Sequence, residues 1–176
     1  MNANAKSLDA LVLLRRDHRQ IEALFKRCEK LMHGEQPALE LPVVVRETID
    51  LLAVHGAVEE QLFYPAMRQA LGDRAAHVQQ SLEEHRVARG LMADLRDLPL
   101  ADARFNARLT VLMELVRHHM REEESTLFPS CRGVCGRRLM RDIGGAMTDL
   151  RVRLERAQAE VNQEMAAPVT KEGSSR

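Results

Sequence analysis

Apolar side chains recur along most of this chain at alternating steps of three and four residues. The first such stripe holds Leu11, Leu14, His18, Ile21, Phe25, Cys28 and Met32. These steps keep side chains on one face of an α-helix, and the alternation typical of strands is missing from the sequence. The pattern predicts a helix over 11–32, with a cap at Ser7 or Asp9 and an end at Gly34.

The same period predicts four further helices, over about 42–65, 74–98, 102–128 and 137–161. Pro65 should kink or stop the second helix, and Pro99 and Pro129 should end the third and fourth, because proline lacks a backbone N–H. The predicted fold class is all-α, an antiparallel up-down four-helix bundle with an additional C-terminal helix. Residues 1–166 should form this one domain, and the polar tail 167–176 should be disordered.

The composition is that of an ordinary globular domain. Of 176 residues, 45% are hydrophobic and 30% are charged, which suits one packed core. The 26 basic and 26 acidic residues balance, so we expect no nucleic-acid partner and no membrane-surface partner. The apolar run 11–14 is too short for a signal peptide or a membrane span. The three cysteines favour free thiols and a cytoplasmic location.

A doubled motif stands out from this helical pattern. The segment HGAVEEQLFYP begins at His55, and the segment HMREEESTLFP begins at His119. In each, a glutamate follows the histidine by four positions, as Glu59 and Glu123. Side chains four residues apart are neighbours on one helix face. Each pair can therefore offer a nitrogen and an oxygen to the same ion.

The other two bundle helices each place one histidine on the apolar stripe. His18 lies between Leu14 and Ile21, and His85 lies between Leu82 and Met92. Counted along the predicted helices at about 1.5 Å per residue, the histidines come close to one height. One layer can then hold His18, His55, Glu59, His85, His119 and Glu123.

Two interpretations of this layer compete. A single histidine on an apolar face is usually a hydrogen-bonded core residue, and Arg86 or Arg121 could neutralise the carboxylates. An unpaired charge in a core is very unfavourable, however, and six such groups in one layer favour bound cations. Mixed imidazole and carboxylate ligands suit iron or manganese, with zinc as an alternative.

The motifs resemble those of a known family. DHRQIEALF around His18, EEHRVARGLM around His85 and the doubled motif are similar to the hemerythrin-like, HHE cation-binding domains, over about 9–130. The resemblance implies a four-helix bundle with a carboxylate-bridged, non-haem di-iron centre, with an oxo or hydroxo bridge. It also implies that the ligands are His18, His55, Glu59, His85, His119 and Glu123.

One departure from the family changes the expected function. Oxygen-carrying hemerythrins have a second histidine four residues from the first on the third helix, where this chain has Ser81 and Arg89. His77 lies eight residues from His85 and is a weaker candidate. Fewer histidine ligands leave more positions for water or an exogenous ligand, which disfavours simple oxygen carriage.

Two classes of function remain. In the first, the centre binds or reacts with a small oxidant (peroxide, O2 or NO) in protection against oxidative or nitrosative stress, with catalase- or peroxidase-like chemistry. In the second, the chain is an oxygen- or iron-sensing or binding module without turnover. A sensor usually needs an output element, and only one extra helix follows the bundle, so the first class is favoured. The oligomeric state stays open.

Other candidate side chains are interpreted as structural. His118 has no histidine counterpart in the first motif and should face solvent. Tyr64 could lie beside a ligand, but packing in the core is the favoured interpretation. Cys131 and Cys135 have a spacing that could serve a redox pair, and free thiols are favoured over one.

Overall fold

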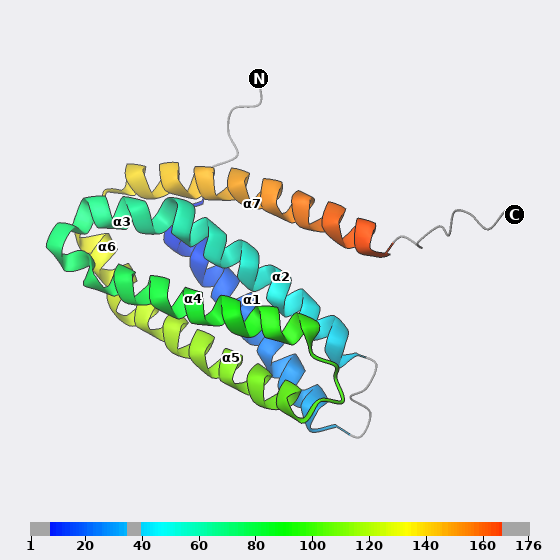
Figure 1. Ribbon diagram of the computed structural model, residues 1–176. Helices are drawn as coiled ribbons and strands as arrows, with labels where there is room; N and C mark the ends of the chain where they lie inside the picture. Colours follow the sequence, from blue (N-terminus) through cyan, green and yellow to red (C-terminus); the bar gives the residue numbers. More distant parts are fainter. Residues whose placement is uncertain (1–7, 35–39, 167–176) are drawn as a thin grey trace, which may run out of the picture.

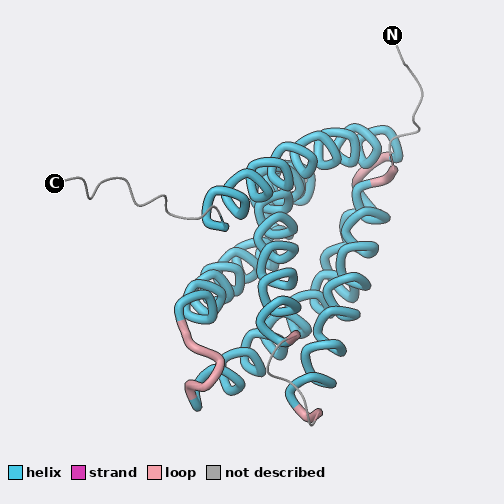
Figure 2. Tube along the Cα trace, turned by 90° about the vertical axis from the view of Figure 1, so that its right-hand side faces the viewer, coloured by secondary structure: helices cyan, strands magenta, loops and turns pink. Residues whose placement is uncertain are grey.

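The computed structural model describes residues 8–34 and 40–166, and within these residues it contains helices and loops but no strand (Figure 1, Figure 2). The α-helices are α1 (Ala10–Met32), α2 (Leu41–Val58), α3 (Tyr64–Leu71), α4 (Ala76–Asp97), α5 (Ala103–Glu122), α6 (Phe128–Val134) and α7 (Arg137–Ala166). Helices α1 and α2 pack together, as do α4 and α5, and the fold is the predicted antiparallel bundle with one more helix (Figure 1). The predictions for Ser7 and for 167–176 lie outside the described residues.

Aspartate caps begin two of the bundle helices. The side chain of Asp9 accepts a hydrogen bond of 2.9 Å from the Leu11 N–H at the start of α1. Asp102 accepts one of 2.9 Å from the Arg104 N–H at the start of α5. These bonds satisfy N–H groups that have no partner inside the helix, so the chain enters each helix at a defined residue.

The prolines of the doubled motif do not end their helices, so the predicted end at Pro129 is wrong. Two short π-helices carry the chain on, η1 (Glu59–Phe63) from α2 into α3 and η3 (Glu123–Leu127) from α5 into α6. The N–H groups of Tyr64 and Phe128 each donate to a glutamate carbonyl five residues back. The prolines then stand in the first turn of the next α-helix, where a missing N–H is tolerated.

Two other boundaries also differ from the prediction. A 3-10 turn, η2 (Gly72–Ala75), precedes α4, so the regular helix begins at Ala76 rather than at 74. The turn starts at Gly72, whose φ of 56° favours glycine. At the C-terminal end, α7 continues to Ala166, five residues past the predicted end at 161.

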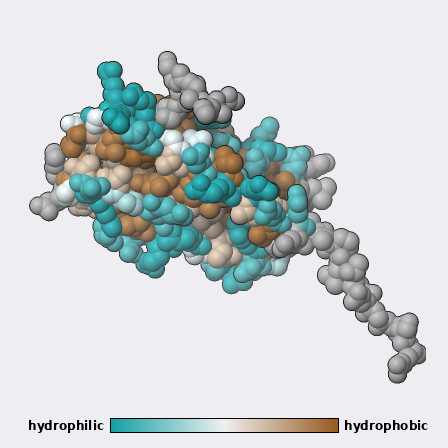
Figure 3. All heavy atoms as spheres, turned by 90° about the horizontal axis from the view of Figure 1, so that it is seen from above, coloured by the Kyte–Doolittle hydropathy of each residue, from teal (hydrophilic) through white to brown (hydrophobic). Residues whose placement is uncertain are grey.

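Helix α7 begins at the end of the bundle where α3 and α6 are found and runs over α1 and α2, with Asn162 bonded to Asp50 of α2 (Figure 1). Gly144 permits its close approach to the start of α1, because a Cβ there would come within 1.9 Å of the Leu8 carbonyl oxygen. From the side of α7, hydrophobic residues appear as separate patches among hydrophilic ones (Figure 3). None of the described helices combines the length and apolar character needed to cross a lipid bilayer.

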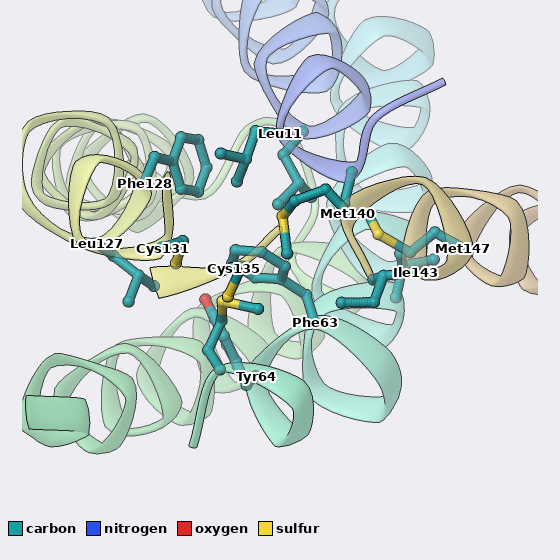
Figure 4. Packing of buried hydrophobic residues seen from close by; sticks show 14 of the residues in the cluster. Leu11, Phe63, Tyr64, Leu127, Phe128, Cys131, Cys135, Met140, Ile143 and Met147 are labelled. Carbon is teal, nitrogen blue, oxygen red and sulfur yellow. The ribbon is translucent and has the colours of Figure 1, made fainter. Parts of the chain in front are cut away.

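A polar layer divides the hydrophobic core into two clusters. Along α1, Leu14 belongs to the cluster shared with α3, α6 and α7. Ile21 belongs to the cluster formed by α1, α2, α4 and α5, and His18 lies between the two clusters. Figure 4 shows the first cluster, where Phe63, Tyr64 and Phe128 lie near side chains of α7. Apolar packing on both sides of His18 leaves its side chain only 4% exposed.

Candidate metal centre

All six residues predicted to bind metal meet in this polar layer. Their ligand atoms form two groups, and within each group all atoms lie within 4.8 Å of one another. The groups are His18, His55, Glu59 and Glu123, and Glu59, His85 and His119. Glu59 belongs to both groups, and a carboxylate has two acceptor oxygens, so this side chain can bridge two ions.

Glu123 also lies between the two groups. One of its oxygens, Oε2, is 3.2 Å from Nε2 of His18 and 3.7 Å from Nε2 of His119. The corresponding oxygen of Glu59 is 3.3 Å from Nε2 of His55 and 3.4 Å from Nε2 of His85. Each carboxylate therefore faces one histidine from each half of the bundle.

The atoms that face one another here are buried, and several lack a protein partner. Among the described residues, Nε2 of His18 and of His55, both oxygens of Glu59 and Oε2 of Glu123 are buried without a hydrogen bond. Leaving a buried polar atom unsatisfied costs about 1–3 kcal/mol, so such atoms are rare in folded proteins. All of these atoms are imidazole nitrogens or carboxylate oxygens that point into the layer. Coordinated cations would satisfy them together, so the donor set fits a metal site.

The other ring nitrogen of each histidine bonds a carboxylate. Nδ1 lies 2.7 Å from Glu124 in His18, 3.3 Å from Asp17 in His55, 2.9 Å from Glu60 in His85 and 2.9 Å from Glu84 in His119. A carboxylate on Nδ1 holds the proton there and turns the unprotonated Nε2 inwards, which is how ligand histidines are commonly oriented. Sequence reasoning missed these four acids.

These four acids form a closed ring around the bundle. Each stands next to a ligand residue in the sequence but bonds the histidine of a neighbouring helix, so that Asp17 of α1 supports His55 of α2. In the same way Glu60 of η1 bonds His85 of α4, and Glu84 of α4 bonds His119 of α5. Glu124 of η3 closes the ring at His18 of α1. A signal was present in the sequence, since an acid adjoins one metal-binding candidate on every bundle helix.

Basic side chains support the same four acids. Arg151 of α7 donates to Asp17, and Arg89 donates to Glu60. Arg15 lies 3.7 Å from Glu124, and His118 lies 3.7 Å from Glu84. His118 is 49% exposed, as predicted, yet it contacts an acid of the ring. The additional C-terminal helix thus reaches the centre through Asp17 and His55.

Comparison with known proteins agrees with this geometry. The family model described as Hemerythrin HHE cation binding domain matches residues 9–131. The chain belongs to the hemerythrin HHE family. The match spans the doubled motif and both single histidines, and it confirms the resemblance seen in the sequence.

A relative and a solved structure show how far this likeness extends. The crystal structure of a hemerythrin HHE cation binding domain-containing protein from Mycobacterium kansasii, a Rv2633c homolog, superposes with a TM-score of 0.71 at 20% identity, over 93% of this chain and 94% of that one. A DNA nickase from Nostoc sp. is 24% identical over 120 residues, which is 68% of this chain. The chain spans only 32% of the length of that relative. The expectation of no nucleic-acid partner stays a prediction.

Tyr64 packs in the core, as the favoured interpretation had it, and its hydroxyl also lies at this HHE centre. Its hydroxyl donates to Oε1 of Glu123 at 2.9 Å and lies 3.4 Å from Nε2 of both His85 and His119. In an α-helix a residue five positions after Glu59 would point about 140° away from it. The π-helix η1 inserts an extra residue and brings Tyr64 round to the ligand face.

Burial and mutual charge make the metal-free HHE centre electrostatically unfavourable. Burial, together with the charge of Glu123, holds the pKa of Glu59 well above its usual range. Burial also acts to raise the pKa of Glu123, but the neighbouring His119 and His18 lower it overall. Burial lowers the pKa of His55 to about 4. Neutral imidazole and ionised carboxylate are the forms that bind metal, and cations would stabilise both carboxylates.

The remaining candidates lie outside the centre. His77 is exposed, and Arg86 bonds Glu83 at 2.8 Å rather than a carboxylate of the layer. Arg121 is exposed as well, so neither arginine neutralises the buried glutamates. Cys131 and Cys135 are free, buried thiols that pack in the cluster drawn in Figure 4.

Proposed function

We propose that this chain is a non-haem di-iron protein whose centre binds and reacts with a small oxidant, foremost peroxide, in protection of the cytoplasm against oxidative stress. His18, His55, Glu59, His85, His119 and Glu123 would hold the two ions, with Glu59 as the bridge. Iron held there would supply redox equivalents and coordination positions for the oxidant. The observation that carries the proposal is the Tyr64 hydroxyl beside His85 and His119.

That hydroxyl stands on the side where the chain lacks a fifth histidine. Ser81 is buried there, and Arg89 is turned to Glu60, so neither supplies an imidazole. The Tyr64 hydroxyl lies 3.4 Å from two ligand nitrogens and is held by Glu123. Its single proton is donated to Glu123, and by turning from Glu123 the hydroxyl could donate it to an oxidant near His85 and His119 instead.

Iron analysis and oxygen release from hydrogen peroxide test the proposal. The purified protein should hold two irons per chain, and Tyr64→Phe should keep them while lowering turnover by about 100-fold or more, as expected for loss of a proton donor. His119→Ala should lose iron and turnover, whereas His77→Ala, which changes an exposed histidine, should lose neither. Two bound irons with turnover no faster than that of free iron salts would instead favour the sensing or binding module.

A further inference from the structure

A cavity of about 390 Å³ lies beside the centre, between α2, α4 and α5. Its inner end is formed by His55, His85 and His119, and its lining also includes Glu60 and Glu84. The cavity therefore reaches the same two imidazoles that the Tyr64 hydroxyl approaches. A ligand inside it would have its inner end at the proposed centre.

The cavity is too large for a small oxidant alone. A water molecule takes up about 30 Å³ in the liquid, and hydrogen peroxide or O2 is only slightly larger than water. Cavities of roughly 300–1,000 Å³ are typical of sites for small organic molecules. The volume of about 390 Å³ lies in that range, so the cavity leaves room for an organic body behind the oxidant.

Small side chains create this space. Ala53, Gly56 and Ala57 on α2 face Ala88 on α4 across the cavity. A Cβ at Gly56 would meet the ring of His85 at 3.5 Å, an ordinary contact distance, so the glycine leaves open a place that a side chain could fill. Larger residues at these positions would close the space between α2 and α4.

The chemistry of the walls indicates a neutral ligand with an apolar body. Away from the histidines the cavity is lined by Leu52, Ala53, Ala88, Met92, Leu115 and Val116. Glu60 and Glu84 are already bonded to His85 and His119, and Arg89 already donates to Glu60. The walls thus offer apolar contact along most of the cavity, and polar contact at the histidines and at the exposed side chains of Gln61 and Arg89.

We propose that this cavity binds an organic hydroperoxide, with its apolar body between α2 and α4 and its hydroperoxy end at His85 and His119. This rests on the proposed function, and it names the substrate class of the same centre. Reduction of such a substrate breaks its O–O bond and yields the alcohol and water. Two thiol groups of an added reductant supply the two electrons and two protons as they are oxidised to one disulfide.

Filling the cavity tests the proposal. Ala88→Leu places a larger side chain in the cavity, and Ala93→Leu makes the same change at an exposed position of the same helix. For iron-loaded protein with an excess of thiol, Ala88→Leu should lower kcat/KM for cumene hydroperoxide by about tenfold or more relative to that for hydrogen peroxide. Ala93→Leu should leave this ratio unchanged.

Binding of the alcohol product gives a measurement that does not depend on turnover. The alcohol 2-phenyl-2-propanol should bind saturably to the iron-loaded wild type and to Ala93→Leu, observed by ligand NMR, and weakly or not at all to Ala88→Leu. Absence of saturable binding to the wild type, or equal loss in both variants, would overturn the organic substrate. If hydrogen peroxide is still turned over in that case, the proposed function stands; alcohol binding without any peroxide turnover would remove the proposed function alone.

Discussion

The two halves of the centre have matching ligands but different surroundings. The braced half, with His18 and His55, has the ring of Phe128 stacked on His18 at a centroid distance of 5.7 Å and an interplanar angle of 17°. Arg151 of α7 reaches this half through Asp17. Aromatic packing and a supported hydrogen bond hold its two imidazoles in place.

The cavity half, with His85 and His119, is built differently. The Tyr64 hydroxyl stands 3.4 Å from both Nε2 atoms, and the cavity between α2 and α4 reaches the two rings. Tyr64 and Phe128 are corresponding residues of the doubled motif. At this position the two copies differ by one hydroxyl group. Under the proposed function, the braced half would hold an ion and the cavity half would meet the oxidant.

The largest effect is expected from removing the carboxylate that both halves share. Glu59→Ala should reduce iron content from two per chain to near zero, and its melting temperature should lie roughly 10 °C below that of the iron-loaded wild type. Bound metal stabilises the folded protein by about 4 kcal/mol, and each kcal/mol of stability changes the melting temperature of a chain of this size by about 2–4 °C. Elemental analysis and thermal unfolding would measure both changes.

Glu114→Ala is the matched control, because Glu114 is an exposed glutamate of α5. It should keep both irons and the melting temperature of the wild type. A Glu59→Ala protein that still held two irons would contradict a bridge at this position.

A smaller effect that separates the halves is expected from the acids behind the histidines. Asp17→Asn removes the charge behind His55, and Glu60→Gln removes the charge behind His85. Loss of such a partner typically weakens metal binding by about 10–100-fold. Each change should therefore weaken one of two binding steps in a metal titration, with the braced half affected by Asp17→Asn and the cavity half by Glu60→Gln.

Asp149→Asn alters an exposed aspartate and should leave both steps as they are in the wild type. Site assignment can come from the Nδ1 proton signals of His55 and His85 in zinc-loaded protein, because Asp17 and Glu60 hold those protons. If either substitution weakened both steps equally, the two halves would not be independent in the way that the geometry indicates.

The smallest effect is expected from α7. Arg151→Ala removes the cation beside Asp17, which is only 5% exposed, and should lower the stability of the folded protein by about 1 kcal/mol, or roughly 2–4 °C in melting temperature. The same change should lower the metal affinity of the braced half by a few-fold, which is about a tenth of the decrease expected for Asp17→Asn. Metal titration and thermal unfolding of Arg153→Ala, an exposed arginine of the same helix, provide the reference.

Much of the fold could be predicted because helical periodicity is a local property. The stripe over 11–32 predicted α1 within one residue at its start, and the cap at Asp9 is present. The helix end predicted at Pro129 was wrong because the effect of a proline depends on the hydrogen-bond pattern before it. The carbonyl oxygens of Glu59 and Glu123 accept hydrogen bonds from N–H groups five residues later in the chain. A sequence pattern with a period of 3.6 residues does not reveal such π-helical bonds.

The sequence by itself determined which residues could bind metal. A histidine and a glutamate four residues apart share a helix face whatever the rest of the chain does, and two such pairs with two more histidines on apolar stripes must come together once the stripes form a core. The convergence of the six side chains is a consequence of burying those stripes.

Only the tertiary structure decided what each half of the centre can do. Asp17 supports a histidine of the neighbouring helix rather than its own neighbour in the chain, and Arg151 reaches it from 134 positions away. Tyr64 and Phe128 occupy equal places in the motif, yet one meets two ligand nitrogens and the other stacks on a ring. The physical reason is that such contacts depend on how neighbouring helices are rotated and spaced, which no single helix encodes.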